Sequence, residues 1–374
     1  MVTIKEVKTS REKKLFINFP LKMYKGNPSF VPNLYMDEVA AMKKKNAHSE
    51  QIDCRFFLAY KDNKVVGRIE GIYQKVSNKV WNQKRVRVSR FDFIDDLEVS
   101  KALLDAVKEW ALSLGMNELV GPLGKNDMER EGLLVEGFNE ESTYEEQYNA
   151  EYYEKHYLSY GFQSECEWVE SRLTAPEVFD HRVIDISEKM MKRLNLHVAE
   201  NKNIGQLLDK YADKFFDIYE ECYGNLYMAV PITKAEQKEL IKGFKLIMTP
   251  EYIKFICDEN DNLVAFGMVF PTIGRHLQKT GGRLTPSTIV KVLKEVKHTK
   301  GLDLGMVGVR KEYANTGIHW AIVKMAVDKL MSGEIEYCDT NLNMIDNLAI
   351  RNMWKYFSQR ENKRRRSYFV KIAD

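Results

Sequence analysis

Carboxylates are concentrated in the middle of the chain, where Asp127, Glu129, Glu131 and Glu136 lie close together. Such a group could position an amine or activate a water molecule, which is general acid–base chemistry. A solvated acidic loop accounts for the same four residues. Both interpretations therefore remain open at this point.

Basic residues form two runs, Lys84–Arg90 and Lys363–Arg366. The first alternates like a strand with one charged face, and the second is predicted to lie in a turn. Either run could bind an anionic partner such as nucleic acid, but no aromatic stacking platform accompanies them and the net charge is only +3. A solvated basic edge is the alternative, and nucleic acid is not the expected partner.

The sulfur and imidazole side chains give no metal-binding pattern. The five cysteines are scattered without a C-x-x-C spacing, and the seven histidines are dispersed. We therefore expect neither a disulfide framework nor a metal site. The first residues form no signal peptide, and the longest apolar run, Leu263–Phe270, is far too short to span a membrane. The expected location is cytoplasmic, away from the membrane.

One series of elements appears twice in the 374 residues. The first copy has a hairpin, a strand, an amphipathic helix and a strand, at 56–67, 85–88, 99–114 and 118–120. The second copy has the same order, at 255–265, 306–309, 318–330 and 335–338. A repeated series of this kind predicts two related α/β domains. The interruption by Pro176 predicts domains over residues 1–174 and 175–374.

The order of several short motifs resembles the GNAT superfamily of acyl-CoA N-acyltransferases. The whole chain resembles a bacterial family of tandem GNAT-like proteins whose function is poorly defined. The motifs lie at Asn27–Pro32, Gly132–Phe138, Tyr152–Lys155, Tyr160–Phe162, Val309–Ile318 and Asp346–Arg351. The resemblance implies two tandem GNAT-like domains, each with a mixed, mostly antiparallel sheet flanked by helices.

The same resemblance implies an acyl-CoA cofactor, with acetyl-CoA as the first candidate. GNAT domains hold its diphosphate with a loop of the pattern V-x-x-x-[QR]-x-x-G-x-[GA] at the start of a helix, where backbone amides face the anion. In the second half the cofactor-binding candidates are Val309, Tyr313, Ala314, Asn315, Thr316, Gly317, Ile318 and His319. Gly317 matches the pattern, whereas Ala314, Asn315 and His319 depart from it. A structural turn in a domain that has lost its cofactor is an equal alternative.

The first half departs further from the family pattern. Its loop carries Asp95, Asp96 and Glu98 and no glycine. Carboxylates repel a phosphate and can cap the helix themselves. We therefore expect Asp95 or Asp96 to be an N-cap, and we place no cofactor in this half.

Two residues are candidates for catalysis. Tyr157 precedes Phe162 at the place where GNAT domains often carry an acidic tyrosine, although a core aromatic would also fit. Asp339 follows the last central strand and could act as a base, although it could equally be a solvated residue at a strand end. In the second half the place of the tyrosine is taken by Trp354, which cannot protonate a thiolate.

The sequence thus indicates an acyl-CoA-dependent, acetyltransferase-like N-acyltransferase that acts on a small-molecule or peptide amine held between the halves. The expected state is a monomer or homodimer. The alternative is a non-catalytic GNAT-fold protein that has lost CoA binding and serves as a ligand- or protein-binding module. A third hypothesis is an aminoacyl- or RNA-linked transferase that uses the basic strand.

Overall fold

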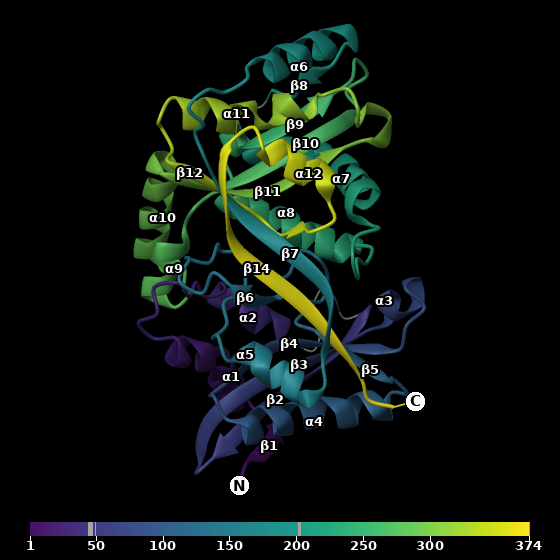
Figure 1. Ribbon diagram of the computed structural model, residues 1–374, viewed down its shortest axis with the longest axis vertical. Coiled ribbons are helices and arrows are strands. Elements are labelled where there is room, and N and C mark those ends of the chain that lie inside the picture. The colour runs from purple at the N-terminus through teal and green to yellow at the C-terminus, as the bar shows by residue number, and fades with distance from the viewer. Residues whose placement is uncertain (44–47, 49, 201–202, 374) are drawn as a thin grey trace. The chain divides into compact units, whose positions relative to one another are not determined.

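The chain divides into two compact units, seen in a computed structural model that describes residues 1–43, 48, 50–200 and 203–373 (Figure 1). The first unit comprises Met1–Val169, Ile273–Lys294 and Asn362–Asp374, and the second comprises Glu170–Thr272 and Glu295–Glu361. The chain first leaves the first unit close to the boundary predicted at residue 174. Two later segments, however, belong to the first unit, so neither unit is contiguous in sequence.

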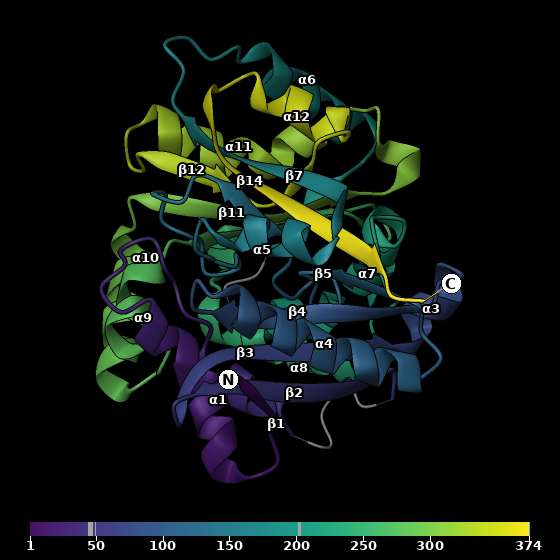
Figure 2. The same cartoon turned by 60° about the horizontal axis from the view of Figure 1, so that its bottom comes forward.

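The first unit is built on a mainly antiparallel sheet in the order β1-β2-β3-β4-β5-β14-β7. Strands β1 to β4 lie side by side in this order (Figure 2). The strands are β1 (Thr3–Glu6), β2 (Ile52–Lys61), β3 (Lys64–Gln74), β4 (Arg85–Phe93), β5 (Glu118–Gly121), β6 (Leu133–Glu136) and parts of β7 (Gln163–Thr174) and β14 (Ser358–Lys371). The helices are α1 (Ser10–Met23), α2 (Tyr35–Ala41), α3 (Lys75–Val80), α4 (Leu97–Ser113), α5 (Tyr153–Tyr160) and α9 (Gly274–Thr280).

The second unit has the sheet order β7-β12-β11-β10-β9-β8. Its own strands are β8 (His197–Val198), β9 (Ile253–Cys257), β10 (Leu263–Pro271), β11 (Gly301–Val309), β12 (Tyr337–Thr340) and β13 (Asn343–Met344). Its helices are α6 (Arg182–Arg193), α7 (Ile204–Tyr223), α8 (Lys234–Ile247), α11 (His319–Met331) and α12 (Leu348–Trp354), with short 3₁₀ turns at Pro250–Tyr252 and Lys311–Tyr313. Helix α10 (Pro286–His298) begins in the first unit and ends in the second.

The predicted repeat is confirmed element by element. Each unit has an antiparallel hairpin, a central strand, a helix and a strand parallel to the central one, namely β2–β3–β4–α4–β5 and β9–β10–β11–α11–β12. The first hairpin turns at Asp62 and Asn63, both with positive φ (51° and 58°), as a two-residue turn between twisted strands requires.

A glycine in the sheet lets each helix of the repeat pack closely. A Cβ on Gly71 of β3 would lie 2.9 Å from the Trp110 ring of α4, and one on Gly267 of β10 would lie 1.9 Å from Ile322 of α11. At each of these glycines the strand carries no side chain, so a side chain of the helix packs directly against the backbone of the sheet. The two copies use the same packing device with unrelated residues.

Charged side chains are buried beneath α2 of the first unit. Arg68 binds Asp92 at 2.7 Å, and Glu38 accepts hydrogen bonds from Arg90 at 3.0 Å and from Arg68 at 3.4 Å. All four side chains are at most 13% exposed. The three arginines of the run Lys84–Arg90 are at most 13% exposed, so the interpretation as a solvated edge was wrong for them, while an anionic partner stays an open alternative. Arg85 and Arg90 pair with acids from distant parts of the chain, whereas Arg87 donates to the Gly124 carbonyl and the Ser77 hydroxyl.

The second basic run is also placed differently from the prediction. Arg364, Arg365 and Arg366 lie in strand β14, which pairs with β5 in the first unit, and not in a turn (Figure 1). Arg364 and Arg366 both bind Glu167, and the buried Arg365 binds Glu146 at 3.1 Å. These ion pairs fix the last strand of the chain in the sheet.

Among the described residues, no helix combines the length and the apolar character that crossing a bilayer requires.

Glu38 should make the first unit sensitive to acid. Burial acts to raise the pKa of Glu38, but Arg90 and Arg68 outweigh it and lower this pKa to about 2. A carboxyl with a lowered folded pKa stabilises the fold above its unfolded value of 4.5, and this contribution is lost as the pH falls toward 2. We expect Glu38→Gln to lower the free energy of unfolding by roughly 3 kcal/mol at pH 7 and by much less at pH 3, measured by urea titration. Asp53→Asn, at an exposed pair with Lys75, is the control; an equal loss at both pH values would contradict the assignment.

Candidate functional site

The central strand of the second unit has one edge that is only partly paired. Strand β11 pairs with the parallel strand β12 over Gly301–Leu304 alone, while its pairing with β10 continues to Val309. The register with β10 skips Gly305, which is therefore a bulge at the point where β12 departs. Beyond the bulge, no described strand lies beside this edge of β11.

Side chains from the end of α7 occupy the open edge. The Tyr223 hydroxyl donates to the Val307 carbonyl at 2.9 Å and accepts from the Val307 amide at 3.1 Å. The Cys222 thiol donates to the Val309 carbonyl at 3.4 Å. Burial raises the pKa of Tyr223 and of Cys222, so both groups stay protonated at neutral pH. These main-chain groups are those that an extended ligand would otherwise pair with.

The loop after β11 leaves backbone amides available at the start of α11. Gly317 adopts φ +80°, and α11 begins without a side-chain cap at Ile318. No described residue accepts a hydrogen bond from the amides of Asn315, Gly317 or Ile318. The first amides of a helix carry a partial positive charge, so an uncapped start of this kind can hold an anion.

Few side-chain charges are free near this loop. Arg310 donates to the Leu263 carbonyl at 2.9 Å and pairs with Glu221 at 3.1 Å, while the second oxygen of Glu221 accepts from the Lys311 amide at 2.6 Å. Burial lowers the pKa of His319, so its imidazole is neutral at pH 7. Lys311 is exposed, and the amides at the helix start add their partial positive charge.

The corresponding place in the first unit is closed. The β4–β5 pairing covers only Arg85–Arg87, and the open edge beyond it is met by two phenols, since the Phe93 amide donates to Tyr153 at 3.1 Å and Tyr152 donates to the Phe93 carbonyl. The predicted cap at Asp96 is confirmed, because its carboxylate accepts from the Glu98 amide at 2.9 Å. Lys61 neutralises Asp96 at 2.6 Å. The carboxylate of Asp96 thus takes the place that a bound anion would have at the start of α4.

The predicted catalytic residue Tyr157 is fully buried. Tyr157 lies in the apolar core of the first unit against Phe91, Phe162 and Tyr368, and no described residue bonds its hydroxyl. Burial raises the pKa of Tyr157. The alternative of a core aromatic accounts fully for this placement, and a catalytic role for Tyr157 stays a prediction.

Asp339 is held by an arginine. Its two oxygens accept from Arg172 at 2.7 and 2.6 Å in a bidentate pair, and its side chain is 4% exposed. Both oxygens of this carboxylate are therefore engaged by one guanidinium. Its role as a base therefore also stays a prediction. Trp354 donates its indole N–H to Asn343 at 2.7 Å, in keeping with a structural role.

The central carboxylates do not form a single solvated loop. Glu129 accepts from Lys125 at 3.2 Å; burial opposes its ionisation, but Lys125 and Arg90 lower its pKa to about 2. Burial and the neighbouring Asp127 raise the pKa of Glu131. Only Glu136 is largely exposed, at 65%. The solvated interpretation was wrong for Glu129, whose carboxylate is an internal ion-pair partner.

Sequence reasoning missed Glu221, Cys222 and Tyr223, the residues that meet the β11 edge and its loop. The available signal was the aromatic spacing of α7, in which Tyr223 follows Tyr219 by one turn and stacks on it at 5.0 Å. That spacing predicts a core face, and nothing in it distinguishes a phenol that bonds to a strand edge.

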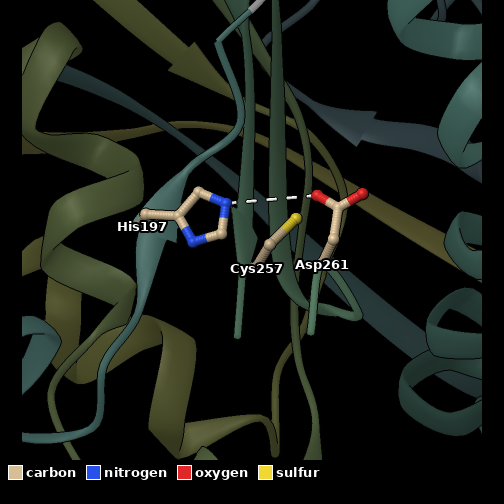
Figure 3. Close-up of side chains that lie close together, drawn as sticks. All are labelled: His197, Cys257 and Asp261. Carbon is tan, nitrogen blue, oxygen red and sulfur yellow. Dashed lines mark ion pairs between the residues drawn. The ribbon is translucent and has the colours of Figure 1, made fainter. Parts of the chain in front are cut away.

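One group of side chains has the composition of a metal site. His197 on β8, Cys257 on β9 and Asp261 in the following turn place their ligand atoms within 4.8 Å of one another (Figure 3). The pairing of His197 with Cys257 across the strands explains this proximity. However, Asp261 already accepts from Tyr211 at 2.5 Å and from Lys210 at 2.6 Å. The lysine ammonium balances the carboxylate, so we assign no metal here.

Comparison with known proteins supports the fold. No family model matches the chain. It is 22% identical over 366 residues to Protein YghO of Escherichia coli (96% of this chain, 93% of that protein), and 24% identical over 319 residues to a bacterial ceramide synthase of Caulobacter vibrioides (82% and 80%). Among solved structures it resembles a tandem GNAT protein from the clavulanic acid biosynthesis pathway with a TM-score of 0.59 and 11% identity, over 100% of this chain and 99% of that one. The chain has the tandem GNAT fold.

A second GNAT structure gives the same result. A GCN5-related N-acetyltransferase from Sphaerobacter thermophilus matches with a TM-score of 0.50 and 9% identity, over 100% of this chain and 96% of that one. The predicted architecture, two tandem GNAT-like domains of mixed α/β structure, is confirmed. One difference between the two copies lies at the start of the repeat helix, where the Asp96 carboxylate caps α4 and the N-cap residue Ile318 of α11 makes no side-chain hydrogen bond.

Replacing Tyr157 separates a core role from a catalytic one. Tyr157→Phe removes a buried hydroxyl without a described partner, so we expect the free energy of unfolding to stay equal or to rise by about 1 kcal/mol. Tyr153→Phe is the matched control, because its hydroxyl bonds to Tyr24 at 2.8 Å and to the Phe93 amide, and its loss should cost about 1–3 kcal/mol. A Tyr157→Phe protein that folds normally but loses acyl transfer would establish the catalytic role instead.

Proposed function

We propose that the protein is an N-acyltransferase whose second unit binds an acyl thioester of coenzyme A. The observation that carries the proposal is the set of free amides of Asn315, Gly317 and Ile318 at the uncapped start of α11. They follow directly on a central strand that has an open edge. An anion site and an extended-chain site thus adjoin each other, which suits a ligand with a diphosphate and a long amide-bearing arm.

The residues fit such a cofactor in two respects. A Cβ on Gly317 would meet nothing closer than Ile186 at 4.0 Å, so there is room for a phosphate against the backbone. Lys311 can add a charge to the amides and the helix dipole. The main chain at Val307 and Val309 would pair with the arm once Tyr223 and Cys222 release it. When bound, the cofactor supplies the acyl carbon that the amine attacks.

The acceptor we favour is a long-chain amino alcohol, within the broader class of small-molecule and peptide amines. A relative that shares 24% identity over most of the chain is named as a bacterial ceramide synthase. A ceramide is the fatty amide of a long-chain amino alcohol, so its synthesis is an N-acylation. A fatty acyl-CoA then becomes the preferred donor to test, beside acetyl-CoA.

Substituting the loop glycine tests the cofactor site. Gly317→Ala introduces a Cβ and a strained positive φ at the amide cradle, and we expect the dissociation constant for CoA to rise at least tenfold in calorimetry. Gly333→Ala is the matched control, because Gly333 has a similar φ of +73° at the other end of α11 and open space around it. The control should share the loss of about 1 kcal/mol in stability but not the loss of binding. Equal affinities of the two variants would contradict the proposed site.

A second candidate function is a binding module that has lost the cofactor. It is favoured by the side chains that already satisfy the strand edge, since Tyr223 makes both hydrogen bonds available at Val307. Glu221 adds a carboxylate beside the loop, where it opposes a diphosphate. In this case the edge of β11 is inherited with the repeat, and the side chains of α7 occupy it permanently.

Tyr223 distinguishes the two functions. If the arm of the cofactor pairs with Val307, the phenol competes with it, and Tyr223→Phe should tighten CoA binding about fivefold or more, the equivalent of one net hydrogen bond. Calorimetry with CoA and palmitoyl-CoA measures this change. Tyr219→Phe, in the stacked neighbour, is the control and should leave the affinity unchanged. If the protein is instead a binding module that has lost the cofactor, neither the unchanged protein nor the Tyr223→Phe variant binds CoA, and Tyr223→Phe only lowers the free energy of unfolding.

A further inference from the structure

The two copies of the repeat differ in the length of one connection. Ten residues, 75–84, join β3 to β4 in the first unit, whereas 29 residues, 272–300, join β10 to β11. The longer connection contains α9 and α10 (Figure 1). Neither helix has a counterpart between β3 and β4, where only the short α3 occurs.

This connection accounts for the net positive charge of the chain. Residues 272–300 contain seven lysines and arginines and one acidic residue, a net charge of +6, while the whole chain carries +3. The remainder is therefore net acidic. So strong an asymmetry points to an anionic partner at this segment.

Part of the charge has a structural use in the first unit. Arg283 donates to Asn18 at 3.1 Å and packs on the Tyr35 ring at 4.0 Å, and Arg275 pairs with Glu141 at 3.4 Å. These contacts fix the start of the connection. In contrast, no acid whose side chain the structure describes pairs with Lys279, Lys291, Lys294 or Lys297, and all four lysines are exposed.

Helix α10 exposes aliphatic side chains among these lysines. One face is buried through Thr288, Val292 and Val296. Away from that face, Ile289, Val290 and Leu293 are 39%, 67% and 53% exposed. At 100° per residue, Val290, Leu293, Lys294 and Lys297 fall within one outward arc of about 100°, and Ile289 and Lys291 lie on its two sides. The outward face of α10 is thus aliphatic and basic together.

We propose that the outward face of α10 binds the surface of an anionic phospholipid membrane. Aliphatic side chains gain from entering the boundary between headgroups and acyl chains, and lysines beside them can extend to the phosphates. Nucleic acid would use the lysines but not Val290 or Leu293, and a second copy of this basic face would be repelled. The inference does not depend on the proposed acyl transfer, although it would bring the protein to the phase that contains long-chain amines.

Co-sedimentation of the full-length protein with large vesicles tests the proposal. We expect binding to vesicles of phosphatidylcholine with 30% phosphatidylglycerol at 0.1 M NaCl, and little binding to phosphatidylcholine alone. Each lysine should contribute about fivefold to the partition coefficient, so the triple variant K291Q/K294Q/K297Q should lose about a hundredfold. Val290→Ser with Leu293→Ser should weaken binding several-fold at the same charge.

Helix α6 supplies matched controls, because it also exposes an aliphatic residue and lysines. Ile186 is 53% exposed, and Lys189 and Lys192 lie on the same helix. I186S and K189Q/K192Q should bind vesicles like the unchanged protein. The proposal is overturned if anionic vesicles do not bind, if the α6 controls lose as much as the α10 variants, if the protein binds polyuridylate but not vesicles, or if the serine variants act only by dissociating a dimer in light scattering.

Discussion

The structure depends on how each unit satisfies the main chain of its central strand after the parallel neighbour departs. Buried amide and carbonyl groups without partners are costly, so something must meet the open edges of β4 and β11. In both units the partner is a phenol, from Tyr152 and Tyr153 in one and from Tyr223 in the other. The phenols come from different helices, α5 and α7. Both copies of the repeat therefore have the open edge, but the tyrosines that bond to it come from different positions in the two copies.

The N-terminal ends of the two repeat helices, α4 and α11, differ in the charge that they present to an anion. In α4 the partial positive charge of the helix start is met by Asp96 and Lys61, an internal arrangement that leaves nothing for a ligand. In α11 the N-cap residue Ile318 makes no side-chain bond and Ser187 accepts from the Ala321 amide alone, while Glu221 binds one residue of the loop but not the amides at Gly317 or Ile318. A ligand with a phosphate therefore has a reason to bind one copy and not the other.

Local signals in the sequence were enough for the repeat and its caps. The Asp62–Asn63 turn and the N-cap at Asp96 depend on neighbouring residues, so both could be predicted. The roles of the arginines could not, because their partners are distant: Arg366 meets Glu167, and Arg90 meets Glu38, only after the sheet has formed. Tyr223 was missed for the same reason. Its spacing on α7 matches a core position, and only the departure of β12 gives its hydroxyl a strand edge to bond.

A site for a ligand requires groups that the protein itself has not satisfied, and in this chain such groups are unevenly distributed. In the first unit the charges around α2 are paired and the helix start is capped. The second unit retains free amides at α11, and the connection between β10 and β11 adds lysines without described acidic partners. The two proposed ligand sites therefore lie at the start of α11 and on the outward face of α10. The first copy, whose charges around α2 are paired and whose helix start is capped, is better suited to a framework than to an anion site, and its departures from the family pattern do not count against a function elsewhere in the chain.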